Sequence, residues 1–430
     1  MKNVITALSV VFCVVVQAAP VVSDVSVVQD ADSKLVTVSY SLSEPAVVTM
    51  SVSENGAPVG GQAASNAFGD MFRRVEAGSR KAFWQPRDSY QNKSVESSGV
   101  KIVVKAWPLD APPDYMVVDV DVTRKNSVWY YEDAESVPDG VQSLRYKTVS
   151  LLLRKIPAAN IQWCMGRNAS EVDWGDQSDN LLRIERGRLV TLTADYYIGV
   201  YEFTQRQWEL LSNKTPSTFR GEDFPDFDLY PVSNVAASWI EMANPEANIQ
   251  PELDKINAVT GLDLKLPTEA QWEYACRAGT SSPFCCGDEW KEVSKYCWHG
   301  GGGDPNYTAN NSADENGVLR PHVVGSKLPN AWGLHDMHGN VAEYCRDWWK
   351  AEATDGTPEI DPERKETDPR DTASGGYYTH VIRGGDYRSS WSQNCRSSYR
   401  GESTINSSWY GNGKNCGFRV SCPAVAAKVE

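Results

Sequence analysis

The sequence predicts a multidomain protein in which an N-terminal all-β sandwich is followed by a loop-rich α+β domain. Its 430 residues are enough for two or three domains, and 41% hydrophobic with 23% charged residues is typical of a globular protein. Residues 20–123 are rich in Val, Ser and Thr and alternate in polarity. Residues 159–424 combine a few helix-start signals with long stretches that have no periodicity. These two patterns define the fold class.

The first 19 residues have the pattern of a secretory signal peptide. Lys2 supplies a positive charge, Val4–Val16 form an apolar core, and small residues near Ala18 suit cleavage after residue 18 or 19. Cys13 lies inside this core, so we expect it to be removed with the signal. No later apolar run is long enough to cross a membrane. The sequence therefore predicts a secreted or periplasmic protein without a membrane span.

Residues 20–123 predict an immunoglobulin-like or fibronectin-like β-sandwich. Asn55-Gly56 is a typical hairpin turn, and the region has no cysteine and no histidine. We interpret it as a spacer or docking module, with carbohydrate binding as an alternative. Strand-like runs occur at Leu35–Leu42, Ala46–Val52, Ala82–Trp84 and Val100–Trp107.

The rest of the chain divides into a linker, a second domain and a tail. Residues 124–158 are charged and contain a Pro-Asp-Gly turn at 138–140, which predicts a linker. Residues 159–424 form the second domain, with strands expected at Leu189–Thr193 and Tyr196–Tyr201. Residues 425–430 are expected to be a short tail.

Capping boxes predict two helices in the second domain. In this motif a threonine side chain accepts the N–H of the residue three positions later, whose side chain returns a hydrogen bond. Thr204 with Gln207 and Thr268 with Gln271 have this spacing. Apolar residues that follow on one face of these helices are expected to be buried: Trp208, Leu211, Trp272, Ala275 and Cys276.

The net charge of −14 argues against nucleic acid as a partner. Phosphate contacts need a basic face, and the sequence has none. We interpret the acidic balance as a solvated surface.

Four motifs in the second domain resemble the formylglycine-generating enzyme (sulfatase-modifying factor) family. They occur in the family's order: Leu266–Ala275, Asn330–Cys345, Val381–Tyr387 and Gly417–Val420. The resemblance implies a heavily elaborated C-type-lectin-like α+β fold for residues 159–424. In the enzymes of this family, two cysteines five positions apart bind copper and activate oxygen, so that a substrate cysteine becomes formylglycine.

The two positions that match the copper cysteines are Ser389 and Asn394. Thiolates suit Cu(I) because both are soft, whereas a hydroxyl and an amide are hard neutral ligands. Cys395 lies one position beyond, and a slip of one residue on a strand turns a side chain to the other face. The family's usual tryptophan before the glutamate is Ala342 here. We therefore expect no copper and no residue with the enzymes' catalytic role.

The resemblance also implies a calcium site at Asp336, Gly339, Val341 and Glu343. Two carboxylates and two backbone carbonyls supply the hard oxygens that calcium prefers, and Gly339 allows a tight path. The alternative is a turn with solvated acids. His335 and His338 stand three positions apart, but without further ligands we expect them to be surface or core histidines.

Nine cysteines remain after the signal peptide, and in an exported protein disulfides are the default expectation. The odd number leaves at least one thiol free or paired between chains. The resemblance favours a disulfide between Cys276 and Cys422. Weaker expectations are Cys345 with Cys395, and Cys285 or Cys286 with Cys297.

The position of the enzymes' active cleft suggests a recognition site. Trp391 lies there among polar residues, and Asp386, Arg388, Ser389 and Arg396 surround it in sequence. The alternative is a surface loop with one tucked aromatic. Two functions remain open: a binding or scaffold protein for an unknown polypeptide or glycan, or a polypeptide-modifying metalloenzyme of the formylglycine-generating type with divergent ligands. Loss of both thiols favours the first.

Overall fold

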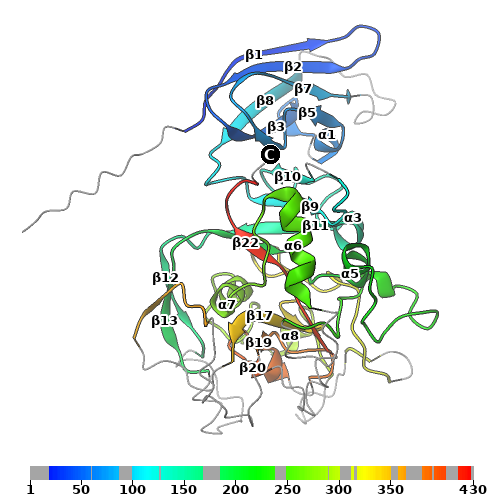
Figure 1. The fold of residues 1–430 in the computed structure, drawn as a ribbon, viewed down its shortest axis with the longest axis vertical. Helices are drawn as coiled ribbons and strands as arrows, with labels where there is room; N and C mark the ends of the chain where they lie inside the picture. The colour runs from blue at the N-terminus through cyan, green and yellow to red at the C-terminus, as the bar shows by residue number, and fades with distance from the viewer. Residues whose placement is uncertain are drawn as a thin grey trace, which may run out of the picture.

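The computed structural model describes residues 19–59, 61–86, 99–124, 127–167, 185–237, 248–288, 290–300, 311–313, 317–349, 357–364, 380–389, 392–402 and 415–427. These residues form two stacked units, with the N-terminal unit at the top of Figure 1 and the C-terminal unit below it. Most of the regular structure is β-sheet. No helix in the described part of the chain is long and apolar enough to cross a membrane.

The N-terminal unit contains two antiparallel sheets whose buried side chains share one apolar cluster. Residues alternate between buried and partly exposed along β2, as a sheet with one covered face requires. Asn55 and Gly56 both have positive φ and form the turn predicted between β3 and β4. One sheet has the order β1 (Val22–Gln29), β2 (Val36–Leu42), β7 (Gly78–Trp84), β5 (Ala67–Gly69). The other contains β4 (Ala57–Pro58), β3 (Ala46–Glu54) and β6 (Arg73–Val75), with β8 (Val100–Trp107) also paired to β3, and helix α1 (Gly61–Ser65) lies nearby.

A five-stranded antiparallel sheet heads the C-terminal unit and corrects two sequence-based boundaries. Its order is β10 (Val128–Tyr131), β9 (Tyr115–Asp119), β11 (Ser150–Ile156), β14 (Tyr196–Gly199), β22 (Ser421–Pro423). Residues 124–158 are therefore not a linker, because they supply β10, α3 (Arg145–Thr148) and β11. Their charges lie outside short apolar runs that are buried in this sheet. The described part of the predicted tail, residues 425–427, also packs, since Ala426 and Ala427 are buried and their N–H groups donate to the Leu109 carbonyl and the Tyr130 hydroxyl.

The remaining strands form smaller sheets below, and both predicted capping boxes are confirmed at Thr204 and Thr268. The helices are α5 (Gln205–Ser212), α6 (Ile249–Thr260), α7 (Glu269–Arg277) and α8 (Trp290–Val293), with short 3₁₀ turns at Phe227–Leu229 and Ser392–Cys395. One sheet has the order β12 (Ile161–Met165), β13 (Arg188–Leu192), β18 (Glu359–Ile360), and another β20 (Gly401–Glu402), β19 (His380–Arg383), β17 (Ala342–Trp348), β21 (Cys416–Gly417). A parallel pair joins β15 (Cys297–Trp298) to β16 (His338–Gly339).

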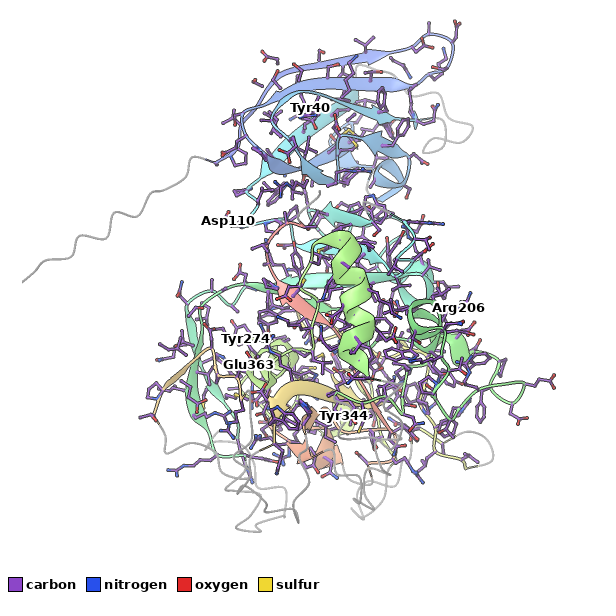
Figure 2. All side chains as sticks on the ribbon, viewed as in Figure 1. Tyr40, Asp110, Arg206, Tyr274, Tyr344 and Glu363 are labelled. Atoms are coloured by element: carbon purple, nitrogen blue, oxygen red, sulfur yellow. The ribbon has the colours of Figure 1, made fainter. Side chains whose placement is uncertain are left out.

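The two units are in direct contact. Tyr130 of β10 donates its N–H to the Phe72 carbonyl at 2.8 Å, and Val47 of β3 belongs to the apolar cluster that covers the five-stranded sheet. In Figure 2, Tyr40 lies in the upper unit, Tyr344 deep in the lower one and Asp110 at the junction between them. The junction is thus a packed interface of apolar side chains and backbone hydrogen bonds.

Candidate functional site

Two of the sequence motifs, Leu266–Ala275 and Val381–Tyr387, meet in a buried ion-pair network around α7. Glu269 and Glu273 lie one turn apart on the buried face of this helix. Arg383, at the end of β19, forms ion pairs with both glutamates, 3.1 Å from Glu269. Arg277 completes the pairing of Glu273 at 2.8 Å, and Arg400 pairs with Glu269 at 2.5 Å. The motif residues therefore hold helix and strand together.

Electrostatics in this network favour the ionised acids. Burial by itself raises the pKa of a carboxyl, because it penalises the charged form. At Glu269 the positive charges of Arg400 and Arg383 outweigh burial and hold the pKa below its usual value. At Glu273, Arg277 and Arg383 have the same effect. These glutamates are permanent partners of the arginines at neutral pH, which does not suit a proton-transfer role.

The Gly-Phe-Arg motif is linked to the predicted calcium loop through a second buried ion pair. Arg419 donates from Nε and Nη2 to the two carboxylate oxygens of Glu343 at 2.7 and 2.6 Å. The Trp272 indole donates to the same carboxylate at 2.8 Å. Glu343 therefore already has a bidentate arginine partner, which the sequence did not reveal.

Asp336 and Glu202 lie near this pair, and neither has a bidentate arginine partner in the part of the chain that the structure describes. Asp336 accepts the Gly325 N–H at 2.6 Å through Oδ2, while its buried Oδ1 has no hydrogen-bond partner among the described residues. Glu202 accepts from Asn340 at 2.6 Å and from the Val341 N–H at 3.1 Å. Burial raises the pKa of Asp336 to about 6 and that of Glu202 well above its usual range, and the neighbouring carboxylates add to the shift of Glu202.

The negative charge of this carboxylate cluster (Glu202, Asp336, Glu343) would suit a bound cation. The three acids share Arg419, and Lys147 also acts on Asp336. Within the described residues, Oδ1 of Asp336 has no donor. No group of three or more His, Cys, Asp or Glu side chains among the described residues is arranged as a metal site. The predicted calcium set has only two side-chain ligands, since Gly339 and Val341 would supply carbonyls, so it stays a prediction. Glu202 was missed, although a glutamate inside the apolar run Val200–Phe203 was a signal for it.

The predicted cleft residues are mostly buried. Asp386 accepts from the Arg388 N–H at 2.9 Å and from the Ser389 hydroxyl at 3.1 Å, and its own N–H donates to that hydroxyl at 3.0 Å. Arg396 is buried in a bidentate pair with Glu185 at 2.8 and 3.0 Å. The Arg388 side chain is exposed. Trp391 lies outside the described residues.

None of the described cysteines forms a disulfide with another described cysteine. Cys276 packs beside His338 and lies 3.5 Å from the Ser397 hydroxyl, whereas Cys422 lies on β22 opposite Tyr197. The predicted pair Cys276–Cys422 is therefore not formed, because helix α7 turns Cys276 toward the His338 segment. Cys395 shares an apolar core with Cys297, whereas Cys345 belongs to another.

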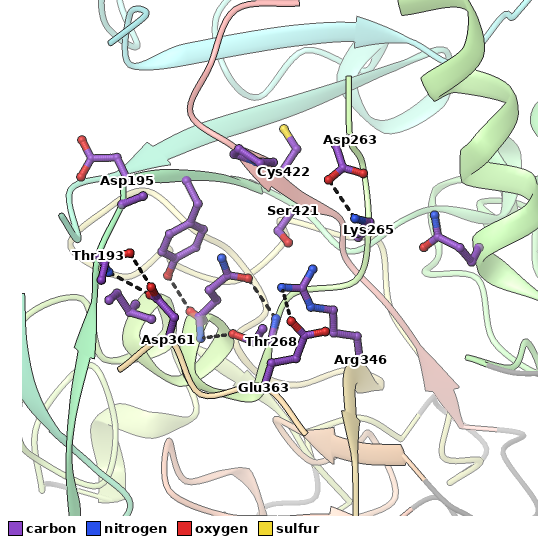
Figure 3. Close-up of a pocket in the computed structure, with 16 residues that line it drawn as sticks. Thr193, Asp195, Asp263, Lys265, Thr268, Arg346, Asp361, Glu363, Ser421 and Cys422 are labelled. Atoms are coloured by element: carbon purple, nitrogen blue, oxygen red, sulfur yellow. Dashed lines mark hydrogen bonds and ion pairs between the residues drawn. The ribbon is translucent and has the colours of Figure 1, made fainter. Parts of the chain in front are cut away.

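A pocket of about 580 Å³ opens where β22 meets the start of α7 (Figure 3). Cys422 lines it, but none of the predicted cleft residues does. Two of its acids pair with its two cations: Lys265 with Asp263 at 2.8 Å and Arg346 with Glu363 at 3.1 Å. Two further acids line it and accept backbone N–H groups, Asp195 from Ala158 and Ala159 and Asp361 from Thr193. The pocket lining thus carries four acids and two bases, which disfavours an acidic ligand.

Comparison with known proteins agrees with the motif network. The family model of the sulfatase-modifying factor enzyme 1-like domain matches residues 171–422. The chain belongs to this family. Chaperone protein LppX of Paenibacillus barcinonensis is 30% identical over 203 residues, which cover 40% of this chain and 72% of that protein. A formylglycine-generating enzyme of Streptomyces coelicolor is 34% identical over 163 residues, covering 36% of this chain and 46% of the enzyme. Among solved structures, Treponema denticola variable protein 1 has a TM-score of 0.45 at 23% identity and covers 64% of this chain and 96% of its own.

Proposed function

We propose that this family member is an exported polypeptide-binding protein without copper oxidase activity. The observation that supports it is the environment of Ser389, at the position of the first copper cysteine. Its hydroxyl is held within a turn by the Asp386 side chain and N–H. A hard hydroxyl committed to a carboxylate offers no ligand to Cu(I), and the amide of Asn394 is no better.

The choice of a polypeptide ligand rests on relatives. The protein named as a chaperone, LppX, is matched over 72% of its length, and a chaperone acts on polypeptides. Formylglycine-generating enzymes of Streptomyces coelicolor and Mus musculus also match. The bacterial enzyme is matched over 46% of its length. A glycan ligand has no comparable support.

Arg388 is the described residue through which we expect this face to act. It is exposed, whereas Asp386, Ser389 and Arg396 are buried. Their fixed hydrogen bonds hold the Arg388 backbone in place. A guanidinium on a rigid turn can donate several hydrogen bonds to peptide carbonyls or acidic side chains.

Further parts of the chain complete the proposal. Residues 1–19 would direct export, and the N-terminal unit would be an immunoglobulin-like or fibronectin-like sandwich that acts as a spacer or docking module. The family domain would have the C-type-lectin-like arrangement. A calcium ion at Asp336, Glu343 and the carbonyls of Gly339 and Val341 would stabilise its loops without taking part in chemistry.

The alternative function is a formylglycine-generating oxidase or related metalloenzyme with divergent ligands. The purified chain, loaded with Cu(I) and incubated with a Cys-x-Pro-x-Arg peptide, tests it directly. One equivalent of bound copper, or an aldehyde product in the mass spectrum, would overturn the binding-protein proposal.

Binding itself can be tested on a cellulose-bound array of overlapping peptides from secreted proteins. We expect a reproducible subset of spots, weakened at least about tenfold by Arg388→Glu if one or two charged hydrogen bonds are lost. Lys101→Glu is the matched control, because Lys101 is an exposed cation on β8 in the N-terminal unit. Equal loss in both variants would mean that net charge, and not this face, governs binding.

A further inference from the structure

Four cysteines that take no part in the proposed function lie close together, and we call them the sulfur cluster: Cys285, Cys286, Cys297 and Cys395. Cys297 and Cys395 are fully buried in one small apolar core with Phe284 and Val293, and Cys286 packs against that core. Burial and the neighbouring Cys395 thiol raise the pKa of the Cys297 thiol, and the two side chains pack in the same core. Cys285 and Cys286 are hydrogen-bonded through their thiols.

The backbone makes room for the buried pair. Parallel pairing of β15 with β16 places Cys297 opposite His338, and the Gly339 N–H donates to the Gly384 carbonyl at 2.8 Å. A Cβ atom at Gly339 would lie 2.8 Å from the Cys297 sulfur, and one at Gly385 would lie 2.8 Å from the Cys395 sulfur. Both glycines have positive φ. Side chains are thus excluded where the two sulfurs lie.

His338 ties the two halves of the cluster together. Its Nδ1 lies 2.7 Å from the Cys395 carbonyl and its Nε2 lies 3.1 Å from the Cys285 N. A carbonyl can only accept, so Nδ1 carries the proton and Nε2 accepts the Cys285 N–H. With both nitrogens committed to the backbone, His338 is a positioning residue here and not an available metal ligand.

Access to the cluster differs between its members. Cys297 and Cys395 are completely buried, while Cys285 and Cys286 are partly exposed. The hydrogen bond from Cys285 lowers the pKa of Cys286 to about 7, whereas burial raises the pKa of Cys297. Of the two partly exposed thiols, Cys286 is therefore the one with substantial thiolate at neutral pH. The thiolate is the form that attacks disulfides.

We propose that Cys297 and Cys395 form a disulfide and that Cys286 is the thiol through which an external small-molecule disulfide oxidises them. The Cys286 thiolate attacks one sulfur of oxidised glutathione, forming a mixed disulfide and expelling one glutathione thiolate. Cys297 then attacks the Cys286 sulfur and expels the second glutathione. Cys395 attacks the Cys297 sulfur, forms the final disulfide and releases the Cys286 thiolate. The two protein thiols lose two electrons and two protons, and one glutathione disulfide gains both.

The test uses the full chain, reduced and refolded, then exposed to oxidised glutathione. Samples are quenched with acid, alkylated and mapped by mass spectrometry. We expect a Cys297–Cys395 linked peptide to accumulate while Cys286 ends alkylated. In Cys286→Ser the same linkage should form at least about tenfold more slowly, because the buried thiols must react directly. Cys164→Ser, which removes an exposed thiol on β12, should leave the rate unchanged.

Two results would overturn the proposal. Full alkylation of Cys297 and Cys395 after equilibration with excess oxidised glutathione would exclude the disulfide. Formation at the parent rate in Cys286→Ser would exclude the entry role. The parent peptide map needs no variant to fold, and circular dichroism of Cys286→Ser checks its fold. The outcome is independent of export and of polypeptide binding, since the oxidant is added to purified protein.

Discussion

Two buried charged regions of the family domain have opposite electrostatics, although Glu343 of one is the strand partner of Arg383 in the other. In the α7 network, two glutamates face three arginines, and the pKa values of Glu269 and Glu273 are lowered despite burial. In the carboxylate cluster, Glu202, Asp336 and Glu343 share Arg419, and the pKa values of Glu202 and Asp336 are raised. Burial acts in the same direction in both, so the number of arginines within reach decides the outcome.

The α7 network therefore needs no added ion, whereas the carboxylate cluster would be stabilised by an added cation. In the α7 network, the arginines neutralise the two glutamates and join α7 to β19. The carboxylate cluster keeps a buried oxygen of Asp336 without a donor among the described residues. A divalent cation there would relieve the repulsion between its acids.

The strongest way to break the balanced region is to remove its central cation with Arg383→Met. This side chain is fully buried, and besides both glutamates it bonds the carbonyls of Ser397 and Tyr399 at 2.7 Å each. We expect a loss of about 3–5 kcal/mol in the free energy of unfolding, because buried partners are left uncompensated. Urea titration measures it. A loss below about 1 kcal/mol would show that the network does not hold the fold.

Asp386 sharpens the comparison because, in the described part of the chain, it is buried with hydrogen-bond donors and no arginine side chain pairs with it. Burial raises its pKa from 3.8 to about 6. The folded state therefore keeps a proton that the unfolded state has lost, and stability falls as pH rises from about 4 to about 6. Asp386→Asn stays neutral, so relative to the parent it should gain roughly 3 kcal/mol between pH 4 and pH 8.

Urea titrations of parent and variant at both pH values provide the measurement. Asp226→Asn, at an exposed position beside the Phe227–Leu229 turn, serves as the control and should show no such gain. If the difference in the free energy of unfolding between the parent and Asp386→Asn is the same at both pH values, the pKa of Asp386 is not raised in the folded state.

The carboxylate cluster is tested by calcium and by Asp336→Asn. Calcium at about 100 times its Kd should stabilise the parent by about 2.7 kcal/mol, and a chelator should reverse this. In chelator, Asp336→Asn should be more stable than the parent by roughly 1–3 kcal/mol, because one of the repelling charges is gone. In calcium the variant should gain nothing further. The melting temperatures of parent and variant, with calcium and with chelator, provide the measurement. An identical melting temperature of the parent in both conditions would mean that the carboxylate cluster binds no calcium.

The features that could be predicted from sequence are those fixed by local chemistry. The capping boxes at Thr204 and Thr268 and the Asn55-Gly56 turn depend on residues within four positions, and the structure confirms them. The motifs identified the family domain. Sequence reasoning failed where residues distant in the sequence determine whether a segment or side chain is buried. The charged residues of 124–158 hid strands β10 and β11, and Arg396 is buried because Glu185, 211 positions away, pairs with it.

The same limit explains the site residues. Asp336 and Glu343 were expected to lie near one centre, and their charges do interact. The bidentate pairing of Glu343 with Arg419 was not expected, because 76 positions separate the two residues and only the fold brings them together. Cys297 and Cys395 meet for a similar reason: their neighbours, not their spacing, place the sulfurs side by side.

The smallest expected effect tests whether burial, and not pairing as such, gives the α7 network its importance. Arg206 and Glu209 form an ion pair at 3.4 Å on α5, with 39% and 33% of their side chains exposed. Water and salt screen such a pair, and holding two long side chains costs entropy, so Arg206→Met should change the free energy of unfolding by less than about 0.5 kcal/mol. Urea titration in low salt and in 0.5 M salt measures it, because the Debye length at the higher salt lies between about 3 and 10 Å and an exposed pair is then largely screened. A loss comparable to that of Arg383→Met would mean that ion pairs stabilise this domain regardless of solvent access, and the contrast between its two buried regions would then need another cause.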